Sequence, residues 1–325
     1  MAKTVKWGII GCGNVTEVKS GPAYKMTEGF ELVAVMRRNL KLAKDYAERH
    51  NVPRYYNDAD ELINDSEIDA VYIATPPDTH HYYAMKVAQA NKICCIEKPM
   101  APNYEECLEI TNTFKTKGLP LFVAYYRRSL PRFNKVKSLL EEKVIGDVRH
   151  IHWYLSRTPS DLDKSGDYNW RTDAKIAPAG YFDDLASHGL DLFNYFFGDV
   201  VKADGISKNQ QQLYTSKDCI VGSWEYASGV LGSGIWSFGA YQREDKVRII
   251  GSEGELSFSI FLEEPIQLIT SKGSETFQIE NPKHIQQFHV ENMAKHLYSD
   301  TKHPSTGETA SHTAWVMGRI LGLIE

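Results

Sequence analysis

Two short stretches of the sequence combine residue types that can move a proton. The first is Glu97-Lys98-Pro99, which directly follows the apolar run from Ile93 to Ile96. The second places Asp184 and His188 in a largely apolar segment. An imidazole titrates near neutral pH, and an ammonium group stabilises a developing oxyanion. These side chains therefore suit proton transfer to or from an alcohol or carbonyl oxygen.

The spacing of the second pair favours one helical face. Asp184 and His188 are four residues apart, and Asp191 lies three residues further on. Helical periodicity brings all three to the same side. A carboxylate and an imidazole in an apolar helix must be paired or used chemically. The alternative interpretation is an N-terminal aspartate cap followed by a histidine satisfied in the core.

The elements around Lys98 alternate between apolar strands and helices. Pro99 cannot donate to a sheet ladder, so the strand before it must end there. This alternation through residue 124 predicts an α/β fold with a doubly wound parallel sheet. Ligands bind such sheets at the carboxyl ends of the strands, where Glu97 and Lys98 stand. The predicted strands cover residues 5–10, 31–36, 70–74, 93–96 and 121–124.

The first predicted strand leads directly into Gly11-Cys12-Gly13-Asn14. A strand that turns on Gly-x-Gly into a helix is typical of a dinucleotide phosphate site, because glycines let the backbone approach the pyrophosphate. The third glycine of this fingerprint is replaced by Thr16, so the motif is incomplete. The alternative interpretation is a plain strand-to-helix turn.

The second predicted strand ends in Arg37-Arg38. An acidic residue at this place would bind the ribose hydroxyls of NAD, whereas paired arginines can hold a 2′-phosphate. The sequence therefore favours NADP as the cofactor, with NAD as the alternative. Two solvated arginines that merely open the next helix are the other interpretation.

The pattern changes after residue 146, and residues 148–155 alternate like a half-buried strand. A long polar loop over 156–170 is of the length usually associated with function. Beyond it, runs separated by turns predict an open antiparallel sheet, with strands at 218–226, 230–237, 247–250 and 255–261. Only two later helices are expected, at 285–298 and 308–323. They are too few to cover both faces of the sheet, so we expect a homo-oligomer.

Bulk properties exclude several classes of protein. The chain has 325 residues, which suggests two domains, and a net charge of -5, which gives no sign of nucleic-acid or membrane binding. No apolar run is long enough for a membrane span, and the first strand follows too early for a signal peptide. Five cysteines without a Cys-x-x-Cys motif suggest a reducing compartment, so we expect a cytoplasmic protein. No three-ligand set has metal spacing, so no metal is expected.

The motifs occur in one order along the chain. Gly-Cys-Gly, Thr75-Pro76-Pro77 with His80, Glu97-Lys98-Pro99 and Asp184-x-x-x-His188-x-x-Asp191 together resemble the Gfo/Idh/MocA family, the relatives of glucose-fructose oxidoreductase, inositol 2-dehydrogenase and dimeric dihydrodiol dehydrogenase. The resemblance covers essentially the whole chain. It implies a Rossmann domain over residues 1–125 that binds a dinucleotide. It also implies an α+β domain over residues 126–325 that binds the substrate and forms a homodimer or homotetramer through its sheet.

The same resemblance implies roles for individual residues. The catalytic set would be Lys98, Asp184 and His188. The cofactor would be bound by Gly11, Gly13 and Asn14 at the pyrophosphate, Arg37 and Arg38 at the adenosine ribose, Thr75 and His80 beside it, and Glu97 near the nicotinamide ribose. The substrate pocket would include Arg128, Trp170 and Arg171. The chain departs from the family where Ala177-Pro178-Ala179 replaces a glycine-rich run.

The expected function is that of an NAD(P)-dependent oxidoreductase. It would transfer a hydride between the nicotinamide and a secondary alcohol or ketone of a sugar, cyclitol or related diol. Two alternatives are a non-enzymatic nucleotide-sensing regulator of the same fold and an NAD-retaining glycoside-cleaving enzyme. The complete catalytic set favours an enzyme over the sensor, and the arginine pair argues against the NAD-retaining enzyme. The sequence leaves open the substrate, and whether Lys98 or His188 donates the proton.

Overall fold

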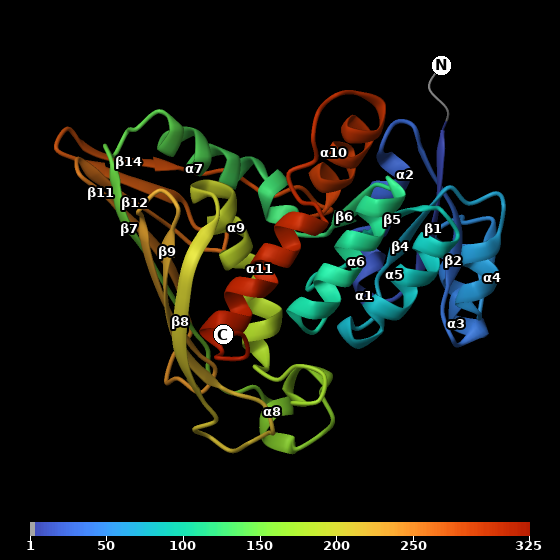
Figure 1. Ribbon diagram of the computed structural model, residues 1–325, viewed down its shortest axis with the longest axis horizontal. Helices are drawn as coiled ribbons and strands as arrows, with labels where there is room; N and C mark the ends of the chain where they lie inside the picture. The colour runs from blue at the N-terminus through green and yellow to red at the C-terminus, as the bar shows by residue number, and fades with distance from the viewer. Residues whose placement is uncertain (1–3) are drawn as a thin grey trace. The chain divides into compact units, whose positions relative to one another are not determined.

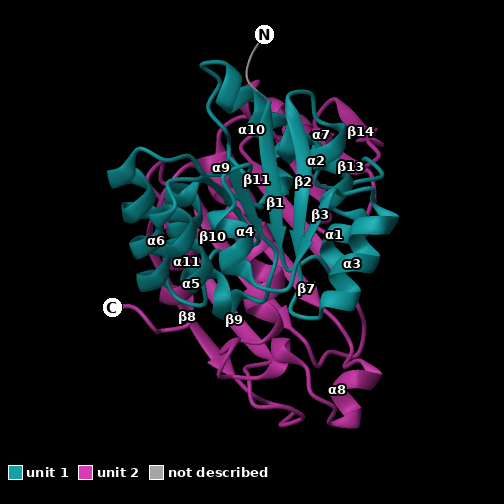
Figure 2. Cartoon of the chain, turned by 90° about the vertical axis from the view of Figure 1, so that its right-hand side faces the viewer, with its two compact units in different colours: residues 1–130, 282–311 teal, residues 131–281, 312–325 magenta. Residues whose placement is uncertain are grey.

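The computed structural model describes residues 4–325. The chain divides into two compact units, and each contains one sheet. The first unit comprises residues 1–130 and 282–311, and the second comprises residues 131–281 and 312–325 (Figure 2). The helix α10 (Gln287–Tyr298) therefore belongs to the first unit although it follows the second unit's sheet in sequence.

The first unit has a parallel sheet with the strand order β3-β2-β1-β4-β5-β6 (Figure 1). The order reverses between β1 and β4, which is the place where open α/β sheets bind ligands. Both β4 and most of β5 are buried, which explains their continuous apolar runs. The strands are β1 (Val5–Ile10), β2 (Phe30–Met36), β3 (Arg54–Tyr56), β4 (Ala70–Ile73), β5 (Ile93–Ile96) and β6 (Leu121–Val123).

The short strand β3 was not among the predicted strands. It pairs only with β2, at the edge of the sheet, and its residues are partly exposed. An edge strand with polar and aromatic residues lacks the apolar run by which the other strands are recognised. The predicted doubly wound parallel sheet is otherwise confirmed.

Side-chain caps define several helices of the first unit. Asn39 accepts from Leu42 at the start of α3, and Asn103 accepts from Glu106 at the start of α6. Gly118 ends α6 in a left-handed conformation, with φ of 65°. The unit's helices are α1 (Asn14–Val18), α2 (Gly21–Met26), α3 (Leu40–Arg49), α4 (Ala59–Asn64), α5 (His80–Gln89), α6 (Tyr104–Lys117) and α10.

The second unit has a mixed sheet with the order β14-β13-β12-β11-β7-β10-β9-β8. Neighbouring strands are antiparallel except β7 and β10, which are parallel. The sheet is thus mostly antiparallel, as predicted, but β8, β13 and β14 lie outside the predicted strands. The strands are β7 (Val148–Ser156), β8 (Val200–Lys208), β9 (Cys219–Tyr226), β10 (Leu231–Ser237), β11 (Glu244–Gly251), β12 (Gly254–Phe258), β13 (Ile266–Thr270) and β14 (Gly273–Phe277).

An aromatic core covers one face of this sheet. The rings of Trp153 and Trp236 meet edge to face at 5.7 Å, and Phe182 and Phe193 pack against them. The helices of the second unit are α7 (Pro131–Glu141), α8 (Asp161–Ser165), α9 (Ser187–Phe197) and most of α11 (Gly307–Ile320).

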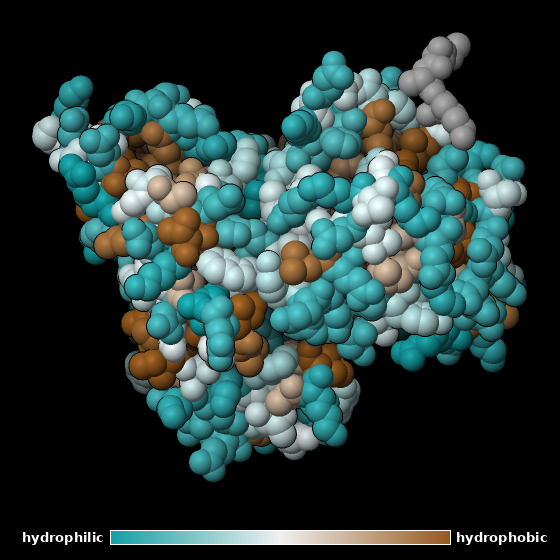
Figure 3. All heavy atoms as spheres, in the orientation of Figure 1, coloured by the Kyte–Doolittle hydropathy of each residue, from teal (hydrophilic) through white to brown (hydrophobic). Residues whose placement is uncertain are grey.

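The surface shown in Figure 3 is mainly hydrophilic, with hydrophobic residues in small separate groups. In the part of the chain that the structure describes, no helix is both long and apolar enough to span a bilayer.

Candidate functional site

The first unit contains a pocket of about 420 Å³ where β1, β2 and β4 end. Five of the predicted cofactor residues come together here from three separate turns of the chain. They are Gly11, Gly13, Arg37, Arg38 and Thr75. Asn14, the first residue of α1, directly follows this glycine turn.

The two glycines of the first turn are required for different reasons. Gly11 has φ of 88°, and a Cβ there would lie 2.8 Å from the methyl group of Thr75. A Cβ on Gly13 would meet only the carbonyl oxygen of Gly11, at 3.8 Å, so the backbone is open to a close-lying ligand. Thr16, which replaces the third glycine, is buried, and its hydroxyl accepts from Gly13 N at 3.0 Å and donates to Gly13 O at 2.9 Å.

The side chains of Arg37 and Arg38 are exposed at the rim of this pocket. Neither guanidinium forms an ion pair with any residue from 4 to 325. Two positive groups beside a glycine turn favour an anionic ligand, and a guanidinium pairs with phosphate through two parallel hydrogen bonds.

His80 ties together two of the turns at the carboxyl edge. Its ring is fully buried, with Nε2 2.8 Å from the carbonyl oxygen of Thr75 and Nδ1 3.0 Å from that of Pro99. Burial lowers the pKa of His80, although both carbonyls act in the opposite direction. The histidine therefore connects the two turns that follow β4 and β5.

Glu97 and Lys98 stand at the end of β5, as predicted from the sequence. The Glu97 side chain is only 8% exposed. Its Oε1 accepts from the Tyr72 hydroxyl and from Gln286 Nε2, and its Oε2 accepts from Lys98 N at 3.2 Å. The Lys98–Pro99 peptide bond is cis. A buried carboxylate thus fixes the backbone from which the Lys98 side chain extends.

Arg128, a predicted substrate residue, lies in the first unit and is buried. Its Nη1 donates to the carbonyl oxygen of Pro304 at 3.0 Å. This hydrogen bond links the end of the segment 1–130 to the loop before α11, within the same unit.

In the second unit, Asp184 and His188 occupy two consecutive helical segments. Phe182–Ala186 forms a π-helix that continues into α9, where the sequence predicted one regular helix. A π-turn contains an extra residue, and such turns often occur at functional sites. Hydrophobic periodicity does not reveal this insertion, because the segment is apolar on most sides.

Asp184 is brought together with two predicted substrate residues. Its Oδ2 accepts from Arg171 Nε at 2.8 Å. The Arg171 guanidinium in turn lies 4.3 Å from the centre of the Trp170 ring. This cation–π contact and the ion pair hold the turn Trp170–Thr172 against the catalytic candidate.

His188 is buried beside the aromatic core. Its ring meets that of Phe261 edge to face at 5.8 Å. The backbone of Phe261 donates to Asp245, which also accepts from the Trp153 indole at 2.9 Å. Asp191, the third polar residue of the motif, is fully buried and accepts from Thr313 at 3.2 Å. Packing therefore holds the histidine in one orientation.

Asp183 is a further candidate that sequence reasoning missed. It accepts from Ala179 N at 2.9 Å, and burial raises the pKa of its carboxyl to about 7, with a smaller contribution from neighbouring Asp184. Carboxyl groups with a raised pKa are common at functional sites, and Asp183 directly precedes the catalytic candidate Asp184. The signal in the sequence is a pair of aspartates in an apolar run, but sequence does not tell which one is desolvated.

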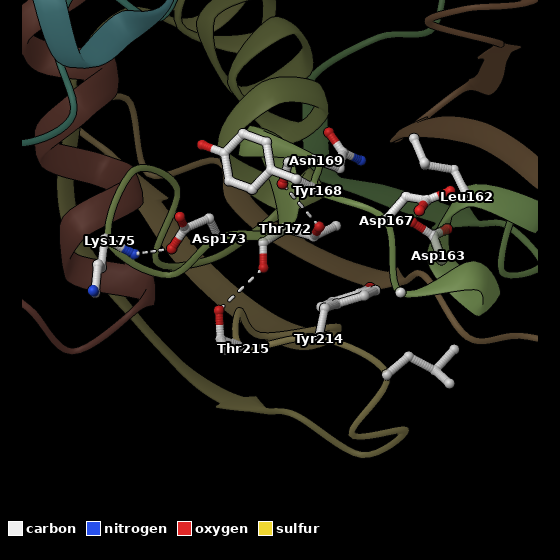
Figure 4. Close-up of a pocket in the computed structure, with 12 residues that line it drawn as sticks. Leu162, Asp163, Asp167, Tyr168, Asn169, Thr172, Asp173, Lys175, Tyr214 and Thr215 are labelled. Atoms are coloured by element: carbon white, nitrogen blue, oxygen red, sulfur yellow. Dashed lines mark hydrogen bonds between the residues drawn. The ribbon is translucent and has the colours of Figure 1, made fainter.

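A separate hollow of about 370 Å³ lies in the second unit, bordered by the loop around Tyr168 and the loop around Tyr214 (Figure 4). Thr215 closes one side by donating to the carbonyl oxygen of Thr172 at 3.2 Å. The polar loop predicted over 156–170 thus helps to form a concave surface. Neither Asp184 nor His188 lines this hollow.

In residues 4–325, no cluster of three or more His, Cys, Asp or Glu side chains could hold a metal ion.

Comparison with known proteins identifies the family. Residues 5–125 match the model for the oxidoreductase family with an NAD-binding Rossmann fold, and residues 133–257 match the GFO/IDH/MocA C-terminal domain. The chain belongs to the Gfo/Idh/MocA family. An oxidoreductase of Formosa agariphila is 38% identical over 327 residues, which cover 99% of this chain and 100% of that protein. The predicted family and the NAD(P)-dependent oxidoreductase activity are thereby confirmed.

Two further proteins represent its more distant relatives. The trans-1,2-dihydrobenzene-1,2-diol dehydrogenase of Sus scrofa is 26% identical over 252 residues, covering 77% of this chain and 72% of that protein. An NAD-binding oxidoreductase structure from Klebsiella pneumoniae has a TM-score of 0.88 at 18% identity, covering 99% and 97% of the two chains, which shows the shared fold. These comparisons support neither the sensor nor the glycoside-cleaving alternative.

Proposed function

We propose that this family member uses NADP(H) to interconvert a secondary alcohol and a ketone on a sugar, cyclitol or related diol. The observation that carries the proposal is the pocket of the first unit, where a glycine turn and two arginines meet. In this proposal the first unit, with the predicted domain 1–125 at its centre, holds the dinucleotide. The second unit provides the substrate side.

The cofactor would be held by groups that the pocket already presents. Gly11, Gly13 and Asn14 allow the pyrophosphate to approach the backbone. Arg37 and Arg38 would bind the 2′-phosphate, and Thr75 lines the adjoining wall. His80 supports this wall through two backbone carbonyls. Glu97 would lie near the nicotinamide ribose. NAD is the alternative cofactor, which the arginine pair disfavours.

Catalysis would need only proton transfer and charge stabilisation from the protein, because the nicotinamide supplies or accepts the hydride. His188 is the proposed acid and base at the substrate oxygen. Lys98 would stabilise negative charge on that oxygen. Asp184, held by Arg171, would orient a substrate hydroxyl or the imidazole.

The substrate class is supported by aromatic and charged groups and by one relative. Trp170 and Arg171 form a stacked pair that suits a hydroxylated ring. Arg128 is the third proposed substrate residue, and acts from the first unit. The dihydrodiol dehydrogenase relative is named for a diol on a ring.

The proposal includes a cytoplasmic homodimer or homotetramer. Several apolar side chains on the second unit's sheet are exposed in the single chain, among them Ile206 and Val221. A sheet face of this kind is usually covered by another surface.

A spectrophotometric screen tests the function. Cyclitols, aldoses, keto-sugars and aromatic dihydrodiols would be assayed with NADP(H) and NAD(H). We expect turnover with at least one class, and a loss of about 10²- to 10⁴-fold in His188→Ala, the usual scale of acid–base catalysis. Lys98→Ala should lose a similar factor, while the cofactor still binds. Tight cofactor binding without turnover on any of these compounds would contradict the proposal.

A further inference from the structure

A buried polar cluster lies beneath the Glu97-Lys98 turn, entirely within the first unit. Tyr72, from the middle of β4, is fully buried and donates its hydroxyl to Glu97 Oε1. Gln286, at the start of α10, is 1% exposed and donates Nε2 to the same oxygen at 2.6 Å. Both contacts are charge-assisted and shielded from water, which makes them stronger than ordinary hydrogen bonds.

The two donors determine which carboxylate oxygen serves the turn. With Oε1 occupied by Tyr72 and Gln286, Oε2 is directed to the backbone of Lys98, whose N–H it accepts at 3.2 Å. The main chain at Lys98 is therefore anchored through Glu97 to a second strand and to a helix. Rotation of this carboxylate would release the turn.

The cluster also reaches the element that follows the glycine turn. The Tyr72 hydroxyl lies 3.2 Å from Ser20 Oγ, and the backbone of Gln286 donates to Lys19 O at 3.1 Å. Lys19 and Ser20 connect α1 to α2. The same buried groups thus connect the end of α1, the helix that follows the glycine turn, with the lysine turn after β5.

We propose that Tyr72 and Gln286 are positioning residues of the active site, which act on Lys98 by fixing the carboxylate of Glu97. This inference rests on the proposed catalytic role of Lys98. It assigns a function to α10, which neither the fingerprint motifs nor the β/α alternation connects with the lysine.

The structure supplies a matched control in Tyr24. Its ring stacks on that of Tyr72 with centroids 5.2 Å apart, and both residues are fully buried. The Tyr24 hydroxyl, however, forms no hydrogen bond to Glu97 within residues 4–325. Tyr72→Phe and Tyr24→Phe therefore remove the same atom from neighbouring buried rings, and only the first removes a donor from the carboxylate.

The expected effect of Tyr72→Phe has a definite direction. Loss of a donor loosens the carboxylate that anchors the backbone of Lys98, so the ammonium group is less often placed to stabilise charge on the substrate oxygen. We expect kcat to fall about 10-fold, the scale of one hydrogen bond to a charged group. The KM for the substrate should stay near the wild-type value, because the lost interaction acts in the transition state. Binding of 2′,5′-ADP, which occupies only the adenosine side, should not change.

The experiment compares the full-length wild type with Tyr72→Phe, Tyr24→Phe and Gln286→Met, using the best substrate from the screen. Gln286→Met should lower kcat at an unchanged KM as Tyr72→Phe does, and Tyr24→Phe should retain the wild-type kcat and KM. Circular dichroism and 2′,5′-ADP titration identify any variant that has not folded. If Tyr72→Phe does not fold, the result for Gln286→Met tests the positioning role in its place.

Two results separate this inference from the proposed function. Similar kcat values for Tyr72→Phe and Tyr24→Phe, with Lys98→Ala inactive, would overturn the positioning role and leave the catalytic role of the lysine intact. Full activity of Lys98→Ala would remove the catalytic role itself, and the positioning role with it.

Discussion

At the scale of single residues, similar expectations led to different structural roles. Arg37 is exposed in the pocket of the first unit, where a ligand can reach it. His80, expected beside the same cofactor, is buried with both ring nitrogens on backbone carbonyls. The difference follows from position, because His80 opens a helix that packs beneath the edge of the sheet, whereas Arg37 follows the end of a strand.

Replacing Arg37 by Asp should weaken NADP(H) binding far more than NAD(H) binding. The change removes one partner of the 2′-phosphate and adds a charge that repels it. Fluorescence titration with both cofactors measures the ratio of dissociation constants, which we expect to change by more than about 10-fold. Lys41→Asp, the same charge change at an exposed residue that does not line the pocket, is the control. Equal weakening of both cofactors by Arg37→Asp would refute the assignment.

The carboxyl of Asp183 predicts a dependence of stability on pH. Its folded pKa of about 7 lies above the ordinary value, so the folded state binds the proton more tightly than the unfolded state does. This contribution to stability is complete below pH 4 and is lost as the pH rises toward 7. Asp183→Asn removes the ionisation while its amide oxygen can still accept from Ala179.

The Asp183→Asn variant should therefore gain stability relative to the wild type between pH 4.5 and pH 8. We expect a relative gain of roughly 1–3 kcal/mol, since one pKa unit is worth about 1.4 kcal/mol and partial solvation reduces it. Urea unfolding at the two pH values measures it. Asp199→Asn, the same substitution at an exposed position, is the control. A pH-independent difference for Asp183→Asn would show that the carboxyl is not desolvated.

At the scale of elements, helix α9 is fixed against the sheet by the absence of a side chain. A Cβ on Gly189 would lie 2.4 Å from the Trp153 ring. Gly189 directly follows His188 in the sequence. The close contact lets the helix backbone rest on the indole. The orientation of the histidine therefore depends on a glycine that carries no chemistry.

Gly189→Ala should destabilise the second unit by about 1–3 kcal/mol, the usual cost of overpacking. Thermal unfolding measures the loss. If the Trp153 ring is the cause, Trp153→Phe should make the glycine substitution less costly, so the double variant loses less than the sum of the single losses. Additive losses would mean that the clash with Trp153 does not explain the effect.

At the scale of the whole molecule, the uncovered face of the second sheet carries the prediction of assembly. Ile206 pairs with Val221, and Val221 pairs with Ile235, which gives adjacent apolar side chains on neighbouring strands. Ile206 is 70% exposed and Val221 is 46% exposed. Burying such a row against a second copy would remove apolar area from water.

Val221→Glu should therefore shift a homo-oligomer toward the monomer. The measurement is sedimentation velocity at micromolar concentration, where we expect the wild type to sediment as a dimer or larger. Tyr241→Glu, at a residue that is 95% exposed and lies outside the strands, should leave the assembly unchanged. A monomeric wild type would contradict the prediction.

The sequence by itself determined the parallel sheet, the glycine turn, the arginine pair and the chemical identity of the catalytic candidates. These features are local, because continuous apolar runs, turn residues and motif spacing are readable along a single stretch of chain. The edge strand β3 and the π-turn before α9 were not predicted from the sequence. Their residues carry no distinctive periodicity.

Tertiary structure alone decided which groups are desolvated and which are partnered. Tyr72, Glu97 and Gln286 lie in three separate segments of the chain, and only folding places both donors on one carboxylate oxygen. The same holds for Asp183 and Asp184, which are neighbours in sequence but form different hydrogen bonds. Burial and long-range pairing depend on contacts between distant residues, and no local pattern encodes them.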